Sequence, residues 1–130
     1  MFVTKDKNIL VFEDQDEIVT LYYEIFAETG WEVIDGYSYL LVSEGGVSEL
    51  INGVGNFQMA IVDLVMPLAN GLDIILELRK QNFNGPILVA SGYADKYTEE
   101  TQVYPNLHFL PKPFTAPQLL EKIDEILAPL

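Results

Sequence analysis

Acidic side chains crowd together where the stretch VFEDQD, residues 11–16, passes from apolar to charged. Glu13, Asp14 and Asp16 repel one another there unless something positive lies between them. Two explanations are open at this point: an ordinary solvated loop, or a site that holds a cation. A further carboxylate, Asp63, directly follows another apolar run, which makes the second explanation worth testing against the rest of the chain.

The chemistry available to such a set is specific. Carboxylates gathered from different segments suit a hard divalent cation such as Mg²⁺, which takes one or two carboxylates together with waters and phosphate oxygens. A carboxylate can also act as a nucleophile and form an acyl phosphate. Phosphoryl transfer then needs alignment and positive charge or hydrogen-bond donors at the phosphoryl oxygens, which Lys112 and Ser91 can supply. Without metal, we expect at least one of the clustered carboxyl groups to have a pKa above its ordinary value.

Short apolar runs precede each of these residues and predict the strands that position them. Most of the runs are continuously apolar, as expected for strands covered on both faces, and they alternate with segments of helical periodicity. This alternation predicts a doubly wound α/β fold, in which a parallel sheet lies between two helix layers. The predicted strands are residues 8–12, 31–34, 59–62, 87–90 and 107–110.

The ends of the predicted strands carry the chemical residues. Ligand sites of such sheets lie at the carboxyl ends of the strands. Glu13 and Asp14 follow the first strand, Asp63 the third and Ser91 the fourth, while Lys112 comes shortly after the fifth. The sequence therefore predicts that all five lie at one edge of the sheet.

Helix signals are clear in three places. Apolar residues recur at helical spacing from Ile18 to Phe26, with Asp14 or Asp16 available as N-cap and Gly30 as the C-terminal stop. A second apolar stripe, with Leu72, Ile75 and Leu78, follows the turn signal Asn70-Gly71, and a third runs from Leu119 to Leu127 after the capping box TAPQ at 115–118. Between them, Gly45-Gly46 should interrupt any helix within residues 38–57, whose boundaries the sequence leaves open.

Bulk composition limits the classes of function. The 130 residues correspond to one typical domain, so a single domain spanning 1–130 is expected. A net charge of −13 and an isoelectric point near 4.1 argue against direct binding to nucleic acid or anionic membranes. No cysteine, leader-like start or apolar run of membrane-spanning length is present, so we expect a cytoplasmic protein without membrane insertion.

Four stretches together carry a resemblance to a known family: ILVFEDQDEI, MAIVDLVMPLANGLDII, PILVASGYAD and FLPKPFTAPQLLEKI. In this order they resemble the receiver domain of two-component response regulators over nearly the whole chain. The resemblance implies a flavodoxin-like sheet with strand order 2-1-3-4-5 and a phosphorelay role that uses Mg²⁺. It implies a phosphoacceptor, able to lose its own phosphoryl group, rather than an enzyme acting on a separate substrate. The implied partners are a histidine kinase or phosphotransfer protein and an output protein that the sequence does not identify.

The resemblance also assigns roles to individual residues. Asp63 matches the phosphoacceptor, and the metal ligands would be Glu13, Asp14, Asp63 and the backbone carbonyl of Val65. Ser91 matches the switch hydroxyl and Lys112 the phosphate-binding lysine. The remaining matches are Gly92 as the small residue beside the phosphate, Phe109 as the switch aromatic, and Lys112-Pro113 as a cis peptide.

Two alternatives stay open beside this interpretation. A pseudo-receiver would keep the fold and bind partners without being phosphorylated. A haloacid dehalogenase-type phosphatase would use the motif DQD with Asp14 as its nucleophile. His108, in an alternating strand, is expected to be structural, and Tyr93, Tyr97 and Tyr104 either form a partner-binding face or simply pack.

Overall fold

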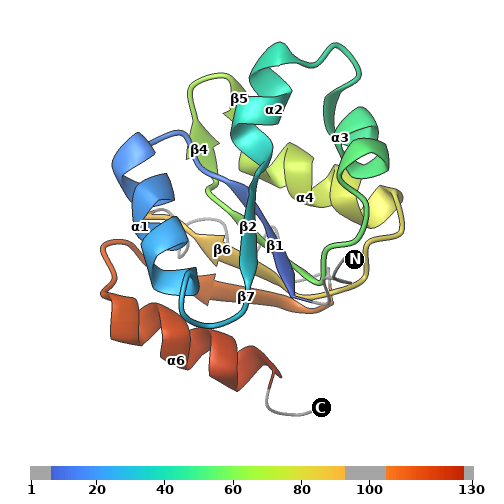
Figure 1. Cartoon of the computed structure of the whole chain (residues 1–130). Coiled ribbons are helices and arrows are strands. Elements are labelled where there is room, and N and C mark those ends of the chain that lie inside the picture. Colours follow the sequence, from blue (N-terminus) through green and yellow to red (C-terminus); the bar gives the residue numbers. More distant parts are fainter. Residues whose placement is uncertain (1–6, 93–104, 128–130) are drawn as a thin grey trace, which may run out of the picture.

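A five-stranded parallel sheet forms the centre of the molecule (Figure 1). The computed structural model describes residues 7–92 and 105–127. The sheet order is β2-β1-β3-β6-β7 and every neighbouring pair is parallel, which confirms the predicted doubly wound fold and the order 2-1-3-4-5 for the strands counted along the chain. The strands are β1 (Asn8–Phe12), β2 (Glu32–Asp35), β3 (Met59–Val62), β6 (Ile87–Ala90) and β7 (Leu107–Leu110).

The strand predictions succeed because the three central strands are buried along their whole length. Every residue of β1, β3 and β6 is buried, as a continuous apolar run in a sheet covered on both faces requires. Four of the five strands have the predicted bounds. The second begins and ends one residue later than predicted, since Trp31 packs beside the sheet and Asp35 is drawn into the pairing with Val11.

One helix layer covers each face of the sheet, so the sheet divides the hydrophobic core into two clusters. The helices α1 (Asp16–Phe26) and α6 (Ala116–Leu127) pack on one face. The helices α2 (Gly36–Val42), α3 (Gly46–Val54) and α4 (Gly71–Lys80) pack on the other, as Figure 1 shows. Alternate strand residues serve the two halves: Val11 and Ile61 lie in the first cluster, Leu10 and Ala60 in the second.

The predicted ends of the first helix are wrong at both termini. Its N-cap is Gln15, which makes no side-chain capping bond, and Asp16 is already helical. The Gln15 N–H instead donates to the Glu13 carboxylate at 3.1 Å, so the acidic loop is organised around the strand end rather than around the helix. The helix ends at Phe26, four residues before Gly30, because a turn at residues 27–30 leads the chain into the sheet.

The glycine pair does interrupt the helix, as predicted. Residues 36–54 form the two short helices α2 and α3, separated by residues 43–45. The Asp35 side chain caps α2 by accepting from the Ser38 N–H at 3.0 Å, and Gly46 has φ = 65°, a left-handed value that favours glycine. Two short helices therefore cross this face in the segment whose helix boundaries the sequence did not determine.

A small hairpin after β3 was not predicted. It consists of β4 (Val65–Met66) paired antiparallel with β5 (Ala69–Asn70). The Asn70 side chain accepts from the N–H groups of Leu72 and Asp73 and so caps α4, in keeping with the turn signal there. Strands of two residues leave no hydrophobic period to detect, which explains why the sequence did not reveal them.

Arg79 connects the end of α4 by hydrogen bonds to the segments that lead into β6 and β7. Its Nη1 donates to the carbonyls of Phe83 and Gly85 at 2.7 and 2.8 Å, and its Nη2 to those of Pro105 and Asn106 at 2.8 and 3.2 Å. These bonds fix the entry of β7, the strand that leads to Phe109 and Lys112. Within the described ranges, no helix is long and apolar enough to cross a membrane.

Candidate functional site

The parallel sheet brings the predicted residues to one edge. Glu13 directly follows β1, Asp63 follows β3 and Ser91 follows β6, and they are 2 %, 7 % and 1 % exposed. Lys112 comes two residues after β7 ends, and its main-chain N–H donates to the Ser91 carbonyl at 3.4 Å. Since parallel strands end on the same side, the register of the sheet alone gathers these groups from four strands.

Lys112 joins the two buried carboxylates. Its ammonium group donates to Glu13 Oε1 at 2.6 Å and to Asp63 Oδ2 at 2.9 Å. The other oxygen of each carboxylate accepts a main-chain N–H: Gln15 donates to Glu13 Oε2 and Val65 donates to Asp63 Oδ1, both at 3.1 Å. Each carboxylate is thus held in place by one charged and one neutral donor, which fixes its orientation.

The ionisation of the pair follows from burial and from these bonds. Burial raises the pKa of Glu13 above its ordinary value, and the donors Lys112 and Gln15 offset this only in part. Burial by itself would lower the pKa of Lys112, but its hydrogen bonds to Glu13 and Asp63 outweigh burial and raise it. The raised pKa of Glu13 has the predicted direction, but its main cause is desolvation, and repulsion from the charge of Asp63 contributes least.

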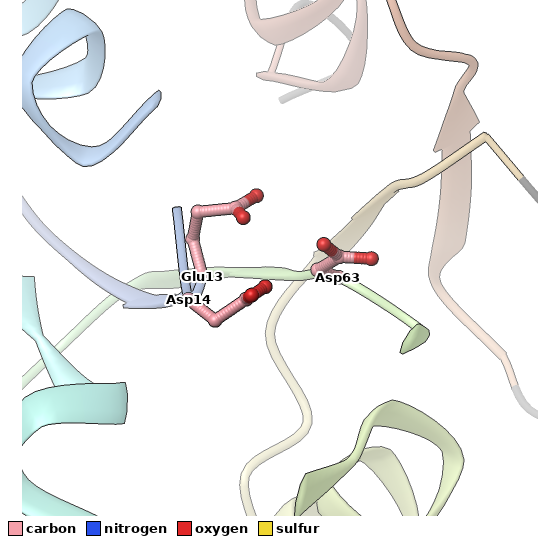
Figure 2. A group of neighbouring side chains, drawn as sticks. All are labelled: Glu13, Asp14 and Asp63. Carbon is pink, nitrogen blue, oxygen red and sulfur yellow. The ribbon is translucent and has the colours of Figure 1, made fainter. Parts of the chain in front are cut away.

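Three carboxylates form a group that could hold a metal ion. One oxygen each of Glu13, Asp14 and Asp63 lie within 4.8 Å of one another. Figure 2 shows the Asp14 carboxylate turned toward Asp63, with Glu13 beside it at the end of β1. A set of oxygen donors alone, partly open to water at Asp14, fits a hard cation such as Mg²⁺. Asp16, the first residue of α1, lies outside this group and is exposed.

A cavity of about 260 Å³ adjoins the Asp63 carboxylate. Its volume and polar lining leave room for a tetrahedral oxyanion between a carboxylate, an ammonium group and a hydroxyl. Gly92 is exposed at the cavity, and a Cβ at this position would meet no atom within 4 Å, so packing alone does not require glycine there. The lining residues are Gln15, Asp63, Val65, Ser91, Gly92 and Lys112.

Two residues at this site were missed by the sequence analysis. Gln15 lines the cavity, and its only signal was its position directly after the acidic pair. Gly71 packs so tightly behind Asp63 that a Cβ at position 71 would overlap the Asp63 carbonyl oxygen and Leu64. Its N–H donates to the Leu64 carbonyl at 3.1 Å, so the start of α4 is fixed directly against the strand end that presents Asp63.

The remaining predicted residues lie around this site or outside the described ranges. Phe109 is half-buried on β7, opposite Val89, and packs into the core on the side of α4. The peptide bond between Lys112 and Pro113 is cis, as the family resemblance implied. His108 Nε2 lies 3.0 Å from Asn106 Oδ1 at the other end of β7, away from the acidic group. Tyr93, Tyr97 and Tyr104 fall outside the described residues.

The family model for the response regulator receiver domain matches residues 9–124. The chain is 28 % identical over 120 residues to the sensor kinase CckA of Brucella abortus, and 25 % identical over 126 residues to the alkaline phosphatase synthesis transcriptional regulatory protein PhoP of Bacillus subtilis. The alignments cover 92 % and 94 % of this chain but only 12 % and 49 % of those two proteins.

Solved structures agree with the sequence comparisons. The response regulator TrrA of Thermotoga maritima, solved in complex with Mg²⁺-BeF, superposes with a TM-score of 0.72 at 26 % identity, over 93 % of this chain and 99 % of that one. The receiver domain of a hybrid histidine kinase CckA superposes with a TM-score of 0.68 at 25 % identity, over 92 % and 98 % of the two chains. With the family model covering most of the sequence and the acidic edge in place, the chain belongs to the response regulator receiver domain family.

Proposed function

We propose that this receiver domain accepts a phosphoryl group on Asp63 from the phosphohistidine of a histidine kinase or phosphotransfer protein. The observation that carries the proposal is the geometry of Asp63: a buried carboxylate at a strand end, beside a cavity of about 260 Å³ and 2.9 Å from the Lys112 ammonium. A carboxylate oxygen attacks phosphorus, the phosphorus–nitrogen bond of the donor breaks, and the leaving imidazole keeps the electron pair and takes a proton.

The surrounding residues have separate tasks in this proposal. Lys112, already positioned on Asp63 Oδ2, neutralises charge on the phosphoryl oxygens, and the Ser91 hydroxyl donates a hydrogen bond to one of them. Glu13, Asp14, Asp63 and the Val65 carbonyl would hold Mg²⁺, which when bound supplies positive charge to the phosphoryl oxygens during transfer. The Val65 N–H keeps the Asp63 carboxylate oriented throughout.

Intact mass spectrometry tests the phosphoacceptor directly. The protein is incubated with acetyl phosphate and Mg²⁺, beside Asp63→Asn and the matched control Asp73→Asn, which changes an exposed aspartate on α4. We expect one phosphoryl adduct that requires Mg²⁺, persists in Asp73→Asn and is lost in Asp63→Asn. An adduct that survives in Asp63→Asn would move the nucleophile to Asp14.

The same experiment distinguishes a phosphorylated receiver from the remaining alternative, a pseudo-receiver. Membership of the receiver family removes the basis for the haloacid dehalogenase interpretation, which rested on the motif DQD alone. A pseudo-receiver keeps the same fold, so only chemistry distinguishes it. A folded protein that gains no adduct with acetyl phosphate and Mg²⁺ would be a pseudo-receiver, and the proposal would fail.

The proposed output is a conformational switch read by a partner protein. Phosphorylation would draw Ser91 toward the new phosphoryl oxygens and let Phe109 rotate into a more buried position, since Phe109 is only half-buried on β7. Amide chemical shifts of Ser91 and residues 106–110, measured with and without a beryllofluoride mimic, test this. Shifts confined to Asp63 and its immediate neighbours would show binding without a switch.

A further inference from the structure

The charge of this protein is confined to one part of the chain. Residues 8–78 contain thirteen acidic side chains and no lysine, arginine or histidine, whereas the remaining residues contain seven acidic and seven basic ones. The net charge of −13 therefore belongs entirely to residues 8–78. In the sheet these residues supply β2, β1 and β3, and they also supply α1, α2, α3 and most of α4. This half of the molecule is therefore strongly acidic, with Lys112 as a cation between Glu13 and Asp63 at its edge.

A groove of about 430 Å³ lies within this acidic half, on the face opposite α1 and α6. It is bounded by α2, the start of α3, the β4–β5 hairpin and α4, the elements grouped at the top of Figure 1. Its apolar lining includes Leu40, Val47, Leu68 and Ile74, which come from these four elements. We call it the α2–α4 groove. Its volume is in the range of clefts that receive the side chains of a ligand, about 300–1,000 Å³.

Exposed apolar side chains mark this region more strongly than any other described part of the molecule. The two most exposed large apolar residues of the described chain are Val42, 84 % exposed at the end of α2, and Leu68, 77 % exposed in the hairpin and lining the groove. Leu41 beside Val42 is also exposed. Of these three, only Leu68 lines the groove, while Leu41 and Val42 follow the lining residue Leu40 at the end of α2. An exposed apolar region beside a groove is typical of a surface that a partner covers.

Acidic side chains complete the groove. Asp73 and Glu77 lie one turn apart on α4 and line it directly, and Glu44 is exposed in the turn between α2 and α3. The residues that line the groove include no lysine, arginine or histidine to balance these charges. A matching partner therefore needs apolar side chains on one face and positive charges beside them.

Charge decides among the classes of occupant. A second copy of this chain that docked through the same face would bring another acidic half against this one and would be repelled. Nucleic acid or an anionic lipid surface would be repelled in the same way. A cationic amphipathic helix satisfies both features of the groove: its apolar stripe fills the cleft and its lysines or arginines face Asp73 and Glu77. We propose that the α2–α4 groove is a docking site for a basic amphipathic helix of a partner protein.

The proposal does not depend on phosphorylation. It concerns a surface on the hairpin and helices and is tested on the unphosphorylated protein, so a failure of the Asp63 chemistry and a failure of the docking site would be recognised separately. The two sites are nonetheless adjacent, because the same hairpin carries Val65, whose N–H donates to Asp63.

The test uses a synthetic helical peptide as the probe. Its leucines recur at positions i, i+3, i+4 and i+7 and its other positions are lysine and alanine, and two controls accompany it: a scrambled peptide of the same composition and a peptide with glutamate for lysine. We expect methyl resonances of Leu40, Val47, Leu68 and Ile74 to shift on titration up to about 2 mM peptide, with saturable binding in the micromolar to millimolar range. Neither control peptide should produce these shifts.

Variants then locate the binding surface. Leu68→Ser, in the hairpin, should weaken binding about tenfold. The control is Leu76→Ser, which changes an exposed leucine of α4 that does not line the groove, and it should leave binding unchanged. Asp73→Asn with Glu77→Gln should weaken binding severalfold and reduce its dependence on salt, while the paired control Glu121→Gln with Asp124→Asn on α6 should leave both unchanged.

Several results would overturn the proposal. If the scrambled peptide bound with the same affinity, binding would reflect unspecific charge attraction. If Leu68→Ser and Leu76→Ser lowered the affinity equally, the groove would not be the binding site. Absence of methyl shifts at the highest peptide concentration would show that a basic amphipathic helix is not the occupant. A concentration-dependent dimer in sedimentation, abolished by Leu68→Ser, would assign the groove to a second copy instead.

Discussion

Lys112 explains how three carboxylates can share one edge of the sheet. Its ammonium group donates to Glu13 and to Asp63 at once, whereas the third carboxylate of the acidic group, Asp14, is not one of its acceptors. Two negative charges near one positive charge are tolerated when both are buried and hydrogen-bonded, and a third adds repulsion that only a further cation relieves. The resting site is therefore preorganised for a cation while still carrying excess negative charge.

Removing the excess charge should stabilise the metal-free protein. We expect Asp14→Asn to raise the free energy of unfolding by about 1 kcal/mol without Mg²⁺, because the amide keeps the shape of the side chain and removes its repulsion with Glu13 and Asp63. Addition of Mg²⁺ should stabilise the parent protein and leave the variant nearly unchanged.

Urea unfolding with and without Mg²⁺ measures both effects. Asp73→Asn, on the exposed face of α4, serves as the control that should respond to Mg²⁺ as the parent does. A destabilised Asp14→Asn, or one that gains as much stability from Mg²⁺ as the parent, would show that Asp14 is not part of a cation site.

The site could be predicted from the sequence only as far as the sheet positions it. Glu13, Asp63 and Ser91 follow buried strands directly, so the topology alone sends them to one edge. The double contact of Lys112 depends on how the turn after β7 approaches β1, 99 residues away in the chain, and no local pattern encodes that approach. The role of Gly71 was hidden for the same reason, because the close approach is to the strand end at Asp63 and not to its own helix.

The helices show what local sequence determines. The capping box before α6 forms as predicted: the Gln118 N–H donates to the Thr115 hydroxyl at 3.2 Å, and the Thr115 N–H donates to the Gln118 side chain at 2.8 Å. At α1 the candidate caps Asp14 and Asp16 do not act as caps, since the acidic loop is held by contacts at the sheet edge. The local sequence thus predicts a helix cap correctly where the helix terminus is exposed. It predicts the cap wrongly where the same side chains make tertiary contacts instead.

The cap of α4 gives a prediction on stability. Asn70 accepts from the Leu72 and Asp73 N–H groups, so Asn70→Ala should lower the free energy of unfolding by about 1 kcal/mol. The control is Asn52→Ala, an exposed position inside α3, which should change stability by less than about 0.5 kcal/mol. Chemical denaturation decides between them, and equal effects of the two changes would show that Asn70 contributes no more than an ordinary helix surface residue.

His108 gives a second prediction, on pH dependence. Burial and the positive charge of Lys122 lower the pKa of His108 below its ordinary value of 6.5, while Glu125 acts in the opposite direction. The folded protein then prefers the neutral imidazole, so this contribution to stability is present above pH 6.5 and is lost as the pH falls through the folded pKa. Because His108 is the only histidine, its imidazole resonances can be followed without assignment of other rings.

Two substitutions on α6 should move this pKa in opposite directions. Lys122→Gln removes a positive neighbour and should raise the pKa of His108, whereas Glu125→Gln removes a negative one and should lower it further. Asp124→Asn, an exposed change between them, should have little effect. Proton NMR titration measures all three, and a parent midpoint at or above 6.5 would contradict the structure-based expectation.

At the scale of the whole molecule, one acidic half faces one nearly neutral half. The uneven distribution has a cost, because thirteen like charges on neighbouring elements repel one another and favour the unfolded chain. Salt screens charges separated by more than about 10 Å at 0.1 M, so the cost should fall as ionic strength rises.

The free energy of unfolding in urea should therefore increase by about 1 kcal/mol between roughly 50 and 500 mM NaCl. The double change Glu24→Gln with Glu28→Gln, at exposed positions of α1 and the turn after it, should make this increase smaller. The matched change Glu121→Gln with Asp124→Asn on α6 should reduce it less, since that half already carries balancing positive charge. A stability that does not respond to NaCl would show that self-repulsion is unimportant here.

The division of charge along the sheet order also gives the protein a permanent electric dipole across its strands. One end of that dipole lies at β2, β1 and β3, and the other at β6 and β7. In the field of a cationic molecule the protein experiences a torque before any contact is made, and it turns its β2 side forward. Orientation during diffusion is then partly set in advance, and encounters with cationic partners should begin at the acidic half more often than chance allows.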